Sequence, residues 1–326
     1  MNLTTTYLGM KLPHPLIVGA AGPLTNDLDT VKALEDEGAA ALVLRSLYEE
    51  EITGEQLSSF FHSDTHDESS AEAGSYFPDP LLAPGPDEYL EHLRRVKSVV
   101  SVPVIASLNG ATPGGWTSYA RLLEQAGAHA IELNLYHSAS DVIASAADVE
   151  NQMIQIVRDV KREVRIPVAA KLTSRFTAFA NFAAQLDAAG VDGFVLFTRF
   201  HRVDIDVLEY EVLRSLELSD SSELQAGLRG IAVLAGRVKA SLSITGGVHT
   251  ALDVVKATMT GAHATQLVSA LLANGPRHLR VLLEGLKTWM TENEWESLEE
   301  MRGNMSFQRI PDPSAYERDA FRRLFR

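Results

Sequence analysis

The sequence predicts one (β/α)8 TIM barrel, an α/β fold, with long loops after its second and sixth strands and a short C-terminal helical extension. Eight short apolar segments alternate with amphipathic helical segments, which is the pattern of repeated βαβ units. Four of these segments also begin with a glycine, so the chain repeats itself. An open doubly wound sheet is the competing architecture, and the count of eight with its even spacing favours the barrel.

The eight predicted strands are short and do not alternate between apolar and polar residues. This pattern is typical of parallel strands that are covered on both faces. The third and fifth strands are entered through Pro103 and Pro167, and proline is tolerated at the start of a strand. In chain order we expect the strands at residues 16–18, 38–44, 102–107, 127–134, 166–171, 190–197, 242–245 and 261–268.

A glycine separates helix from strand in four of the repeats. Each of these glycines follows an amphipathic stretch, such as residues 27–37 or 177–189, and precedes an apolar one. Helices commonly end in a residue with left-handed backbone, which glycine adopts without steric cost. We therefore expect left-handed backbone at Gly38, Gly127, Gly190 and Gly261.

Two long segments interrupt the alternation of strands and helices after the second and sixth strands, at residues 48–86 and 199–227. Long loops at this end of a barrel usually serve as lids or substrate walls, although a disordered surface loop is equally compatible with residues 63–71. His62 and His66 lie among acidic residues, and we interpret them as solvated, so no metal site is expected. We expect residues 1–290 to form the barrel and 291–326 to pack on it or on a partner subunit.

Composition narrows the class of protein. The formal net charge of −14 argues against nucleic acid as a partner, because phosphate recognition needs clustered Lys and Arg. The chain contains no cysteine, which excludes disulfides, cysteine-ligated metals and a thiolate nucleophile. Apolar runs fall short of the ~18 residues needed to span a bilayer, and the first residues lack a signal-peptide pattern. We therefore expect a cytoplasmic enzyme with no membrane partner.

The carboxyl ends of the strands carry the chemistry of such barrels, so their residues are the candidate site. Gly246 and Gly247 follow the seventh strand, and Ser269 and Ala270 follow the eighth. Backbone N–H groups at these two strand ends commonly hold a phosphate. A plain tight turn at the two glycines is the alternative.

Lys171 and two asparagines end neighbouring strands. A lysine at the buried end of the fifth strand requires a negative partner, either the edge of a reduced flavin or a carboxylate of the core. Asn109 and Asn134 can hold the edge of a planar ring by hydrogen bonds. Together with a phosphate site these residues favour FMN, and the lack of a GxGxxG motif after the first strand argues against a Rossmann-type NAD site.

Several motifs resemble the dihydroorotate dehydrogenase family, specifically its class 1-like FMN barrels, over roughly residues 1–290. They are TTYLGMKLPHPLIVGAAG at 5–22, ELNL at 132–135, PVAAKL at 167–172, ITGGVHTALD at 244–253 and VSALLANGP at 268–276. LFTRF at 196–200, followed by Asp204 and Asp206, and MRGNMS at 301–306 are similar to the dihydroorotate dehydrogenase-like subgroup.

The resemblance implies roles for the residues at the strand ends. Three small residues would lie along the flavin, two polar residues would contact the ring or ribityl chain, two would hold the ring edge, and the rest would bind the phosphate. In that order they are Ala20, Ala21 and Gly22; Ser46 and Asn109; Asn134 and Lys171; and Gly246, Gly247, Ser269 and Ala270, with Gly227 a weaker candidate.

Three candidate catalytic residues depart from the family pattern. Where the family carries a Cys or Ser base after ELNL, this chain has His137, whose usual pKa suits proton abstraction; the alternative is that the loop has lost its base. Arg45 replaces a lysine and could grip a substrate carboxylate in bidentate fashion. Thr198 replaces the asparagine that holds orotate, which puts recognition of orotate in doubt.

The resemblance implies an FMN-dependent dehydrogenase that oxidises dihydroorotate to orotate in pyrimidine biosynthesis, with hydride passing to flavin N5. A diverged small-molecule substrate is also compatible with the departures. The alternatives are a flavin-binding protein without dehydrogenase chemistry, such as an electron-transfer or regulatory subunit, and a phosphate-binding barrel that uses no flavin. A homodimer and a separate electron-acceptor protein are the expected partners.

Overall fold

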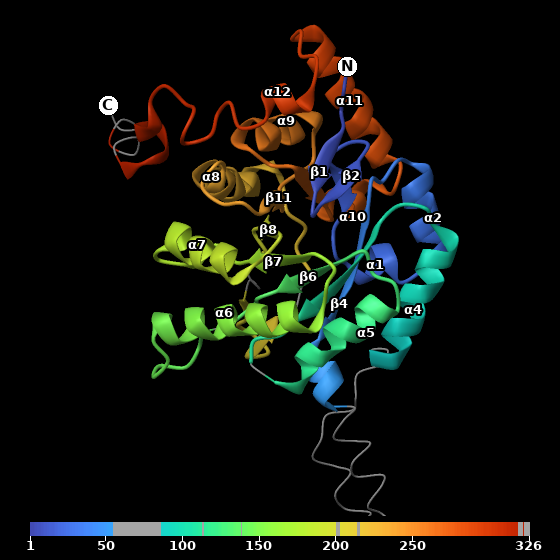
Figure 1. Cartoon of the computed structure of the whole chain (residues 1–326), viewed down its shortest axis with the longest axis vertical. Coiled ribbons are helices and arrows are strands. Elements are labelled where there is room, and N and C mark those ends of the chain that lie inside the picture. Colours follow the sequence, from blue (N-terminus) through green and yellow to red (C-terminus); the bar gives the residue numbers. More distant parts are fainter. Residues whose placement is uncertain are drawn as a thin grey trace, which may run out of the picture.

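The computed structural model describes residues 1–54, 86–112, 114–137, 139–199, 203–213, 216–318 and 322. Residues 63–71, His62 and His66 lie outside these ranges. Eight parallel strands close into a barrel, which confirms the predicted (β/α)8 fold (Figure 1). In barrel order from the first strand of the chain they are β3 (Leu16–Val18), β4 (Leu42–Tyr48), β5 (Val104–Asn109), β6 (Ala130–Asn134), β7 (Val168–Leu172), β8 (Gly193–Leu196), β11 (Ser241–Thr245) and β12 (Ala264–Leu267).

Helices surround these strands, with α6, α7 and α8 on one side in Figure 1 and α2 and α4 on the opposite side. Their starts follow local rules: Ser145 and Asp148 form a capping box at α6, and Thr250 and Asp253 form one at α9. The helices are α1 (Gly22–Thr25), α2 (Leu28–Asp36), α4 (Pro86–Val99), α5 (Tyr119–Gln125), α6 (Ala146–Glu163), α7 (Phe179–Ala189), α8 (Leu224–Leu234), α9 (Ala251–Thr260), α10 (Ser269–Asn274), α11 (His278–Glu292) and α12 (Leu298–Met301).

The glycine repeat has the predicted backbone. Gly38, Gly127, Gly190 and Gly261 have φ of 96°, 96°, 100° and 124°, which confirms the positive φ expected at helix ends. In three repeats, the side chain two positions after the glycine accepts a hydrogen bond from the start of the preceding barrel strand. His129 Nδ1 accepts from Val104 N at 3.0 Å, Asp192 Oδ2 from Val168 N at 2.8 Å, and His263 Nδ1 from Leu242 N at 3.0 Å.

An antiparallel hairpin of β1 (Thr5–Tyr7) and β2 (Met10–Leu12) closes the amino end of the barrel. Leu8 N donates to Ser241 Oγ at 3.1 Å, and Ser241 is the first residue of β11. Tyr7 and Leu8 are buried among inward-facing residues such as Ile17 and Val43. The functional end is therefore the opposite, carboxyl end.

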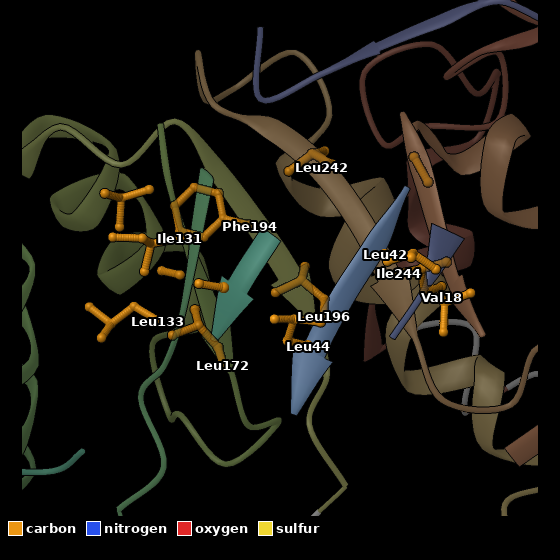
Figure 2. Close-up of a cluster of buried hydrophobic side chains, with 14 of the residues drawn as sticks. Val18, Leu42, Leu44, Ile131, Leu133, Leu172, Phe194, Leu196, Leu242 and Ile244 are labelled. Atoms are coloured by element: carbon orange, nitrogen blue, oxygen red, sulfur yellow. The ribbon is translucent and has the colours of Figure 1, made fainter. Parts of the chain in front are cut away.

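Alternate strand residues form a second apolar layer outside the barrel. Leu42 and Leu44 face the helices, whereas Val43 between them belongs to the interior cluster. Figure 2 shows this outer layer as side chains from six of the strands, labelled Val18, Leu42, Leu44, Ile131, Leu133, Leu172, Phe194, Leu196, Leu242 and Ile244. Burial on both faces explains why the strands read as continuous apolar runs.

The segment after β8 contains a second hairpin of β9 (Asp204–Asp206) and β10 (Glu211–Leu213), followed by the 3-10 helix η3 (Ser221–Glu223). The C-terminal segment contacts the barrel helices. Met305 N donates to Met259 O at 2.8 Å, and Phe307 N donates to Ala232 O at 3.0 Å. Across the described residues, no helix combines the length and apolar character that crossing a membrane requires.

Candidate active site

A cavity of about 500 Å³ lies at the carboxyl ends of the strands. Eleven residues predicted from the sequence line it together. They come from β4, β6, β7 and the segments after β3, β8, β11 and β12: Ala20, Ala21, Gly22, Arg45, Ser46, Asn134, Lys171, Thr198, Gly246, Gly247 and Ser269. Its remaining lining includes Tyr48, Arg199, Ser219 and Gln266, which the sequence analysis did not single out.

Four predicted residues do not line this cavity. Asn109 ends β5 beside Asn134 in the register of the sheet and is 9% exposed. Ala270 is fully buried in α10. Gly227 lies where α8 meets β11, since a Cβ there would lie 2.8 Å from Ile244 Cδ1, and it lines a neighbouring cavity instead. His137 lies in the loop after β6.

Lys171 is held by a buried carboxylate. Its Nζ donates to Glu132 Oε1 at 2.9 Å, and Gln266 Nε2 donates to Glu132 Oε2. Glu132 is 1% exposed, so the pair is shielded from water. Gln266 Oε1 has no hydrogen-bond partner within the described part of the chain, and it is buried at the cavity wall. The core carboxylate that the sequence left open as the partner of Lys171 is therefore Glu132.

The two glycines after β11 form a close backbone cradle. Gly246 and Gly247 have φ of 82° and 74°, and a Cβ on Gly247 would lie 2.8 Å from Leu224 Cα. Ser219 joins the cradle to the next strand end: Gly247 N donates to Ser219 Oγ at 3.2 Å, and Ser219 N donates to Ser269 Oγ at 3.0 Å. Ser219 was not predicted, because the long insertion that contains it carries no motif that aligns it with the strand ends.

Asn134 and Thr198 are joined across the cavity floor. Thr198 Oγ1 donates to Asn134 Oδ1 at 3.1 Å, and Thr198 N donates to Leu172 O at 2.8 Å. This bond assigns the carbonyl oxygen of the Asn134 amide to the Thr198 hydroxyl. Both residues line the cavity, so an amide and a hydroxyl lie in the same wall.

Arg45 is engaged by protein groups. Its Nη1 donates to both carboxylate oxygens of Glu51 at 3.2 Å and to Ser46 O at 3.0 Å. The guanidinium lies over the Tyr89 ring, 5.3 Å from its centroid. Side-chain exposures of 13% for Arg45 and 17% for Glu51 show that the ion pair is largely buried.

The acidic residues 49–51, which begin a helical turn after β4, also contact the segment after β5. Glu49 Oε2 accepts from Ala111 N at 2.9 Å and from Thr112 N at 3.2 Å. Burial and the Glu51 and Glu50 carboxylates raise the pKa of Tyr48, which lines the cavity. Nothing in the sequence marked these glutamates, because an acidic run is usually a solvated surface.

His137 directs one ring nitrogen to its own loop. Nδ1 accepts a hydrogen bond from Ala139 N at 2.8 Å, so a neutral ring carries its proton on Nε2. In this arrangement the ring nitrogen available to a ligand donates a hydrogen bond. Acceptance of a proton requires release of the Ala139 N–H. As for metals, no group of three His, Asp or Glu side chains in the described ranges is arranged to hold an ion.

The fold and the cavity define a class of protein: a (β/α)8 barrel whose strand ends combine a glycine backbone cradle with a polar, lysine-containing wall. The family model described as dihydroorotate dehydrogenase matches residues 2–290. The chain belongs to the dihydroorotate dehydrogenase family, and that membership makes it an enzyme of the dehydrogenase type.

Curated relatives span nearly the whole chain. The catalytic subunit of dihydroorotate dehydrogenase B (NAD(+)) from Thermoplasma volcanium is 28% identical over 308 residues, covering 93% of this chain and 98% of the relative. The proteins of the same name from Thermoplasma acidophilum and Pyrococcus abyssi are each 27% identical, over 93% and 92% of this chain and 98% of each relative. The predicted family is therefore confirmed.

Proposed function

We propose that the protein is an FMN-dependent dehydrogenase that oxidises a CH–CH bond of a small cyclic amide. Dihydroorotate, which is oxidised to orotate in pyrimidine biosynthesis, is the compound of this class named for the relatives. One observation carries the proposal: a single cavity joins the Gly246–Gly247 cradle to the wall formed by Lys171 and Asn134. A phosphate at one end and a planar ring at the other would span it.

The residues present fit FMN. Gly246, Gly247 and Ser269 would hold the phosphate through backbone N–H groups and a hydroxyl, with Gly247 N–H released from Ser219 Oγ. Lys171 and Gln266 would hold the ring edge, and the buried Gln266 Oε1 would find a donor there. FMN bound in this way would supply the hydride acceptor. The cavity volume of about 500 Å³ lies within the usual range for cofactor sites.

The chain itself would supply the proton acceptor and the ring contacts. Oxidation of a CH–CH bond removes one hydride and one proton. His137 is the proposed acceptor of that proton, after rotation of its ring away from Ala139 N. Asn134 and Thr198 would orient the substrate ring, and Arg45 lines the same wall.

The visible spectrum of the purified protein tests the cofactor, and anaerobic bleaching tests the reaction. We expect flavin absorbance in the protein as purified or after reconstitution with FMN, and bleaching by a dihydropyrimidine. A protein that stays colourless after reconstitution would exclude both flavin hypotheses. His137→Ala should retain FMN and lose substrate-driven bleaching while dithionite still reduces the flavin; an unchanged bleaching rate would remove His137 from the reaction.

A second candidate is a flavin-binding protein without dehydrogenase chemistry. The engagement of His137 Nδ1 by Ala139 N favours it, because no basic nitrogen of that ring then faces a ligand. Normal reduction by dithionite together with no bleaching by any dihydropyrimidine would support this candidate.

We propose two partners. Relatives are named as catalytic subunits, which supports a separate electron-acceptor protein, and the chain has no cysteine for an iron–sulfur cluster of its own. A homodimer is also proposed; the β9–β10 hairpin supports it by exposing Leu208 and Tyr210 at 82% and 90%. Sedimentation velocity tests the dimer, and Tyr210→Asp should weaken it. A cytoplasmic location stays a prediction.

A further inference from the structure

Every cation that lines the cavity, among the residues described, is paired with a carboxylate of the protein. Lys171 Nζ lies 2.9 Å from Glu132 Oε1. Arg199 is held in a fork, with Nε 2.9 Å and Nη2 3.0 Å from the two oxygens of Glu223. Arg45 completes the set with Glu51 at 3.2 Å. The positive charges of this wall are therefore neutralised before any ligand arrives.

Arg45 is the cation most relevant to a substrate carboxylate, and its position is fixed from several sides. Arg45 N donates to Thr25 Oγ1 at 3.0 Å, the guanidinium lies over the Tyr89 ring, and Glu51 accepts from Nη1 with both oxygens. A ligand carboxylate would have to displace Glu51 or lie beside it. Displacement would leave a largely buried carboxylate without its partner, and a place beside Glu51 would bring two carboxylates onto one guanidinium, so both arrangements are unfavourable.

Two carboxylates also act on Tyr48, which lies three residues beyond Arg45 at the end of β4. Besides burial, the Glu51 and Glu50 carboxylates raise the pKa of Tyr48, and they do so more strongly than the Arg45 guanidinium lowers it. The Tyr48 side chain lines the same cavity as Arg45. Tyr48 N donates to Glu51 Oε2 at 3.2 Å, so a carboxylate entering beside Tyr48 would meet the Glu51 charge.

We propose that this site selects an uncharged cyclic amide and discriminates against the corresponding carboxylate, with Glu51 as the residue that sets this specificity by occupying Arg45. Asn134 and Thr198 offer the neutral hydrogen-bonding groups that amide and carbonyl edges require. The inference rests on the proposed function, because it concerns the ligand of the same flavin site. It narrows the proposed substrate class from small cyclic amides, dihydroorotate among them, to cyclic amides that carry no carboxylate.

Uracil and orotate are a matched pair of probes, since they differ by one carboxylate. Titration calorimetry of the FMN-loaded protein with each compound measures binding without any chemical step. We expect wild-type protein to bind uracil at least about tenfold more tightly than orotate. Glu51→Gln removes the competing charge and keeps the side-chain shape, so it should shift the ratio of dissociation constants toward orotate by about tenfold or more.

Glu50→Gln is the control variant, because it makes the same charge change on the neighbouring residue. It should shift the ratio by less than about threefold, because the Glu51 carboxylate contacts Arg45 directly at 3.2 Å and has the larger charge effect on Tyr48. Glu51→Ala should shift the ratio of dissociation constants in the same direction as Glu51→Gln. The second variant keeps the test valid if one of the two fails to fold. FMN content, measured first, confirms that each variant is loaded.

Several results would overturn the inference. Tighter binding of orotate than uracil by wild-type protein would do so, as would an unchanged ratio in both Glu51 variants, or binding of neither compound by FMN-loaded protein. In each of these cases the bound flavin leaves the cofactor part of the proposed function standing. Failure of wild-type protein to take up FMN would instead end the proposed function before the titration begins.

Discussion

Lys171 Nζ donates to Glu132 Oε1 at 2.9 Å inside the barrel, where the two side chains are 10% and 1% exposed. Glu132 Oε2 also accepts from Gln266, so the carboxylate joins β6 to β7 and β12. The pair places a charged amine at the cavity wall and supplies the negative partner that its burial requires. The stability of the Lys171–Glu132 pair is therefore coupled to the geometry of the proposed cofactor site.

Substitutions at Lys171 and Glu132 should reveal how strongly the two side chains are coupled in their effect on stability. Lys171→Met leaves Glu132 as an unpaired buried charge and should lower the free energy of unfolding by about 3–5 kcal/mol. The double variant Lys171→Met with Glu132→Gln removes both charges, while the amide oxygen introduced in place of the carboxylate can still accept from Gln266. We expect it to be more stable than Lys171→Met alone, by urea denaturation. If the double variant lost as much stability as the sum of the losses in Lys171→Met and in Glu132→Gln alone, the two side chains would not be coupled.

Alanine substitutions at Gly247 and Gly9 distinguish the cost of backbone strain from the cost of a steric clash in the cradle. Both have positive φ, 74° and 71°, but only a Cβ on Gly247 would meet Leu224. Gly9→Ala should lower the free energy of unfolding by about 1–2 kcal/mol through strain alone. Gly247→Ala should lower it by about 1–3 kcal/mol more and should weaken FMN binding. Equal losses in the two variants would show that the close approach to Leu224 is not required.

The link between Thr198 and Asn134 can be tested with two near-isosteric changes. Thr198→Val removes the donor to Asn134 Oδ1, leaves the amide free to turn, and should weaken FMN binding several-fold, by about 1 kcal/mol. Thr198→Ser keeps the hydroxyl and should bind FMN within about twofold of wild type. Fluorescence titration of the apoprotein with FMN measures both, and a similar loss in Val and Ser variants would point to packing instead.

Acid should destabilise the fold through His263. Burial, and then the Arg302 charge, lower the pKa of His263 to about 4, so the ring is neutral at pH 7 and its Nδ1 accepts from Leu242 N. The unfolded state therefore binds the proton first, so stability present above about pH 6.5 is lost as pH falls toward about 4, by about 2–3 kcal/mol.

His263→Asn retains an acceptor that does not titrate, as Asp192 provides an acceptor at the matching position of its repeat. Its unfolding free energy should fall less steeply than that of wild type between about pH 6.5 and about pH 4. Identical slopes for the two proteins would assign the acid sensitivity to another group, such as His14, whose pKa burial also lowers to about 4.

The local features of this protein were predictable from the sequence. Gly38 and Gly190 end helices because a left-handed residue is needed there, and that requirement is read over a few neighbouring positions. The same holds for the apolar strands, whose residues face either the interior or the helices. The barrel follows from repeating these units eight times. Gly246, Gly247, Ser269 and Lys171 could be placed at the site because each directly ends or follows a strand.

Only the tertiary structure decided which of these side chains meet. Glu132 and Gln266 are 134 positions apart and become partners only when the barrel closes. Ser219 joins the cradle because the insertion after β8 returns to it, and no local pattern encodes that return. Arg45 was predicted as a clamp for a carboxylate, and the fold supplies that carboxylate from Glu51. Local sequence determines backbone geometry, whereas pairing of charges depends on the folded path of the whole chain.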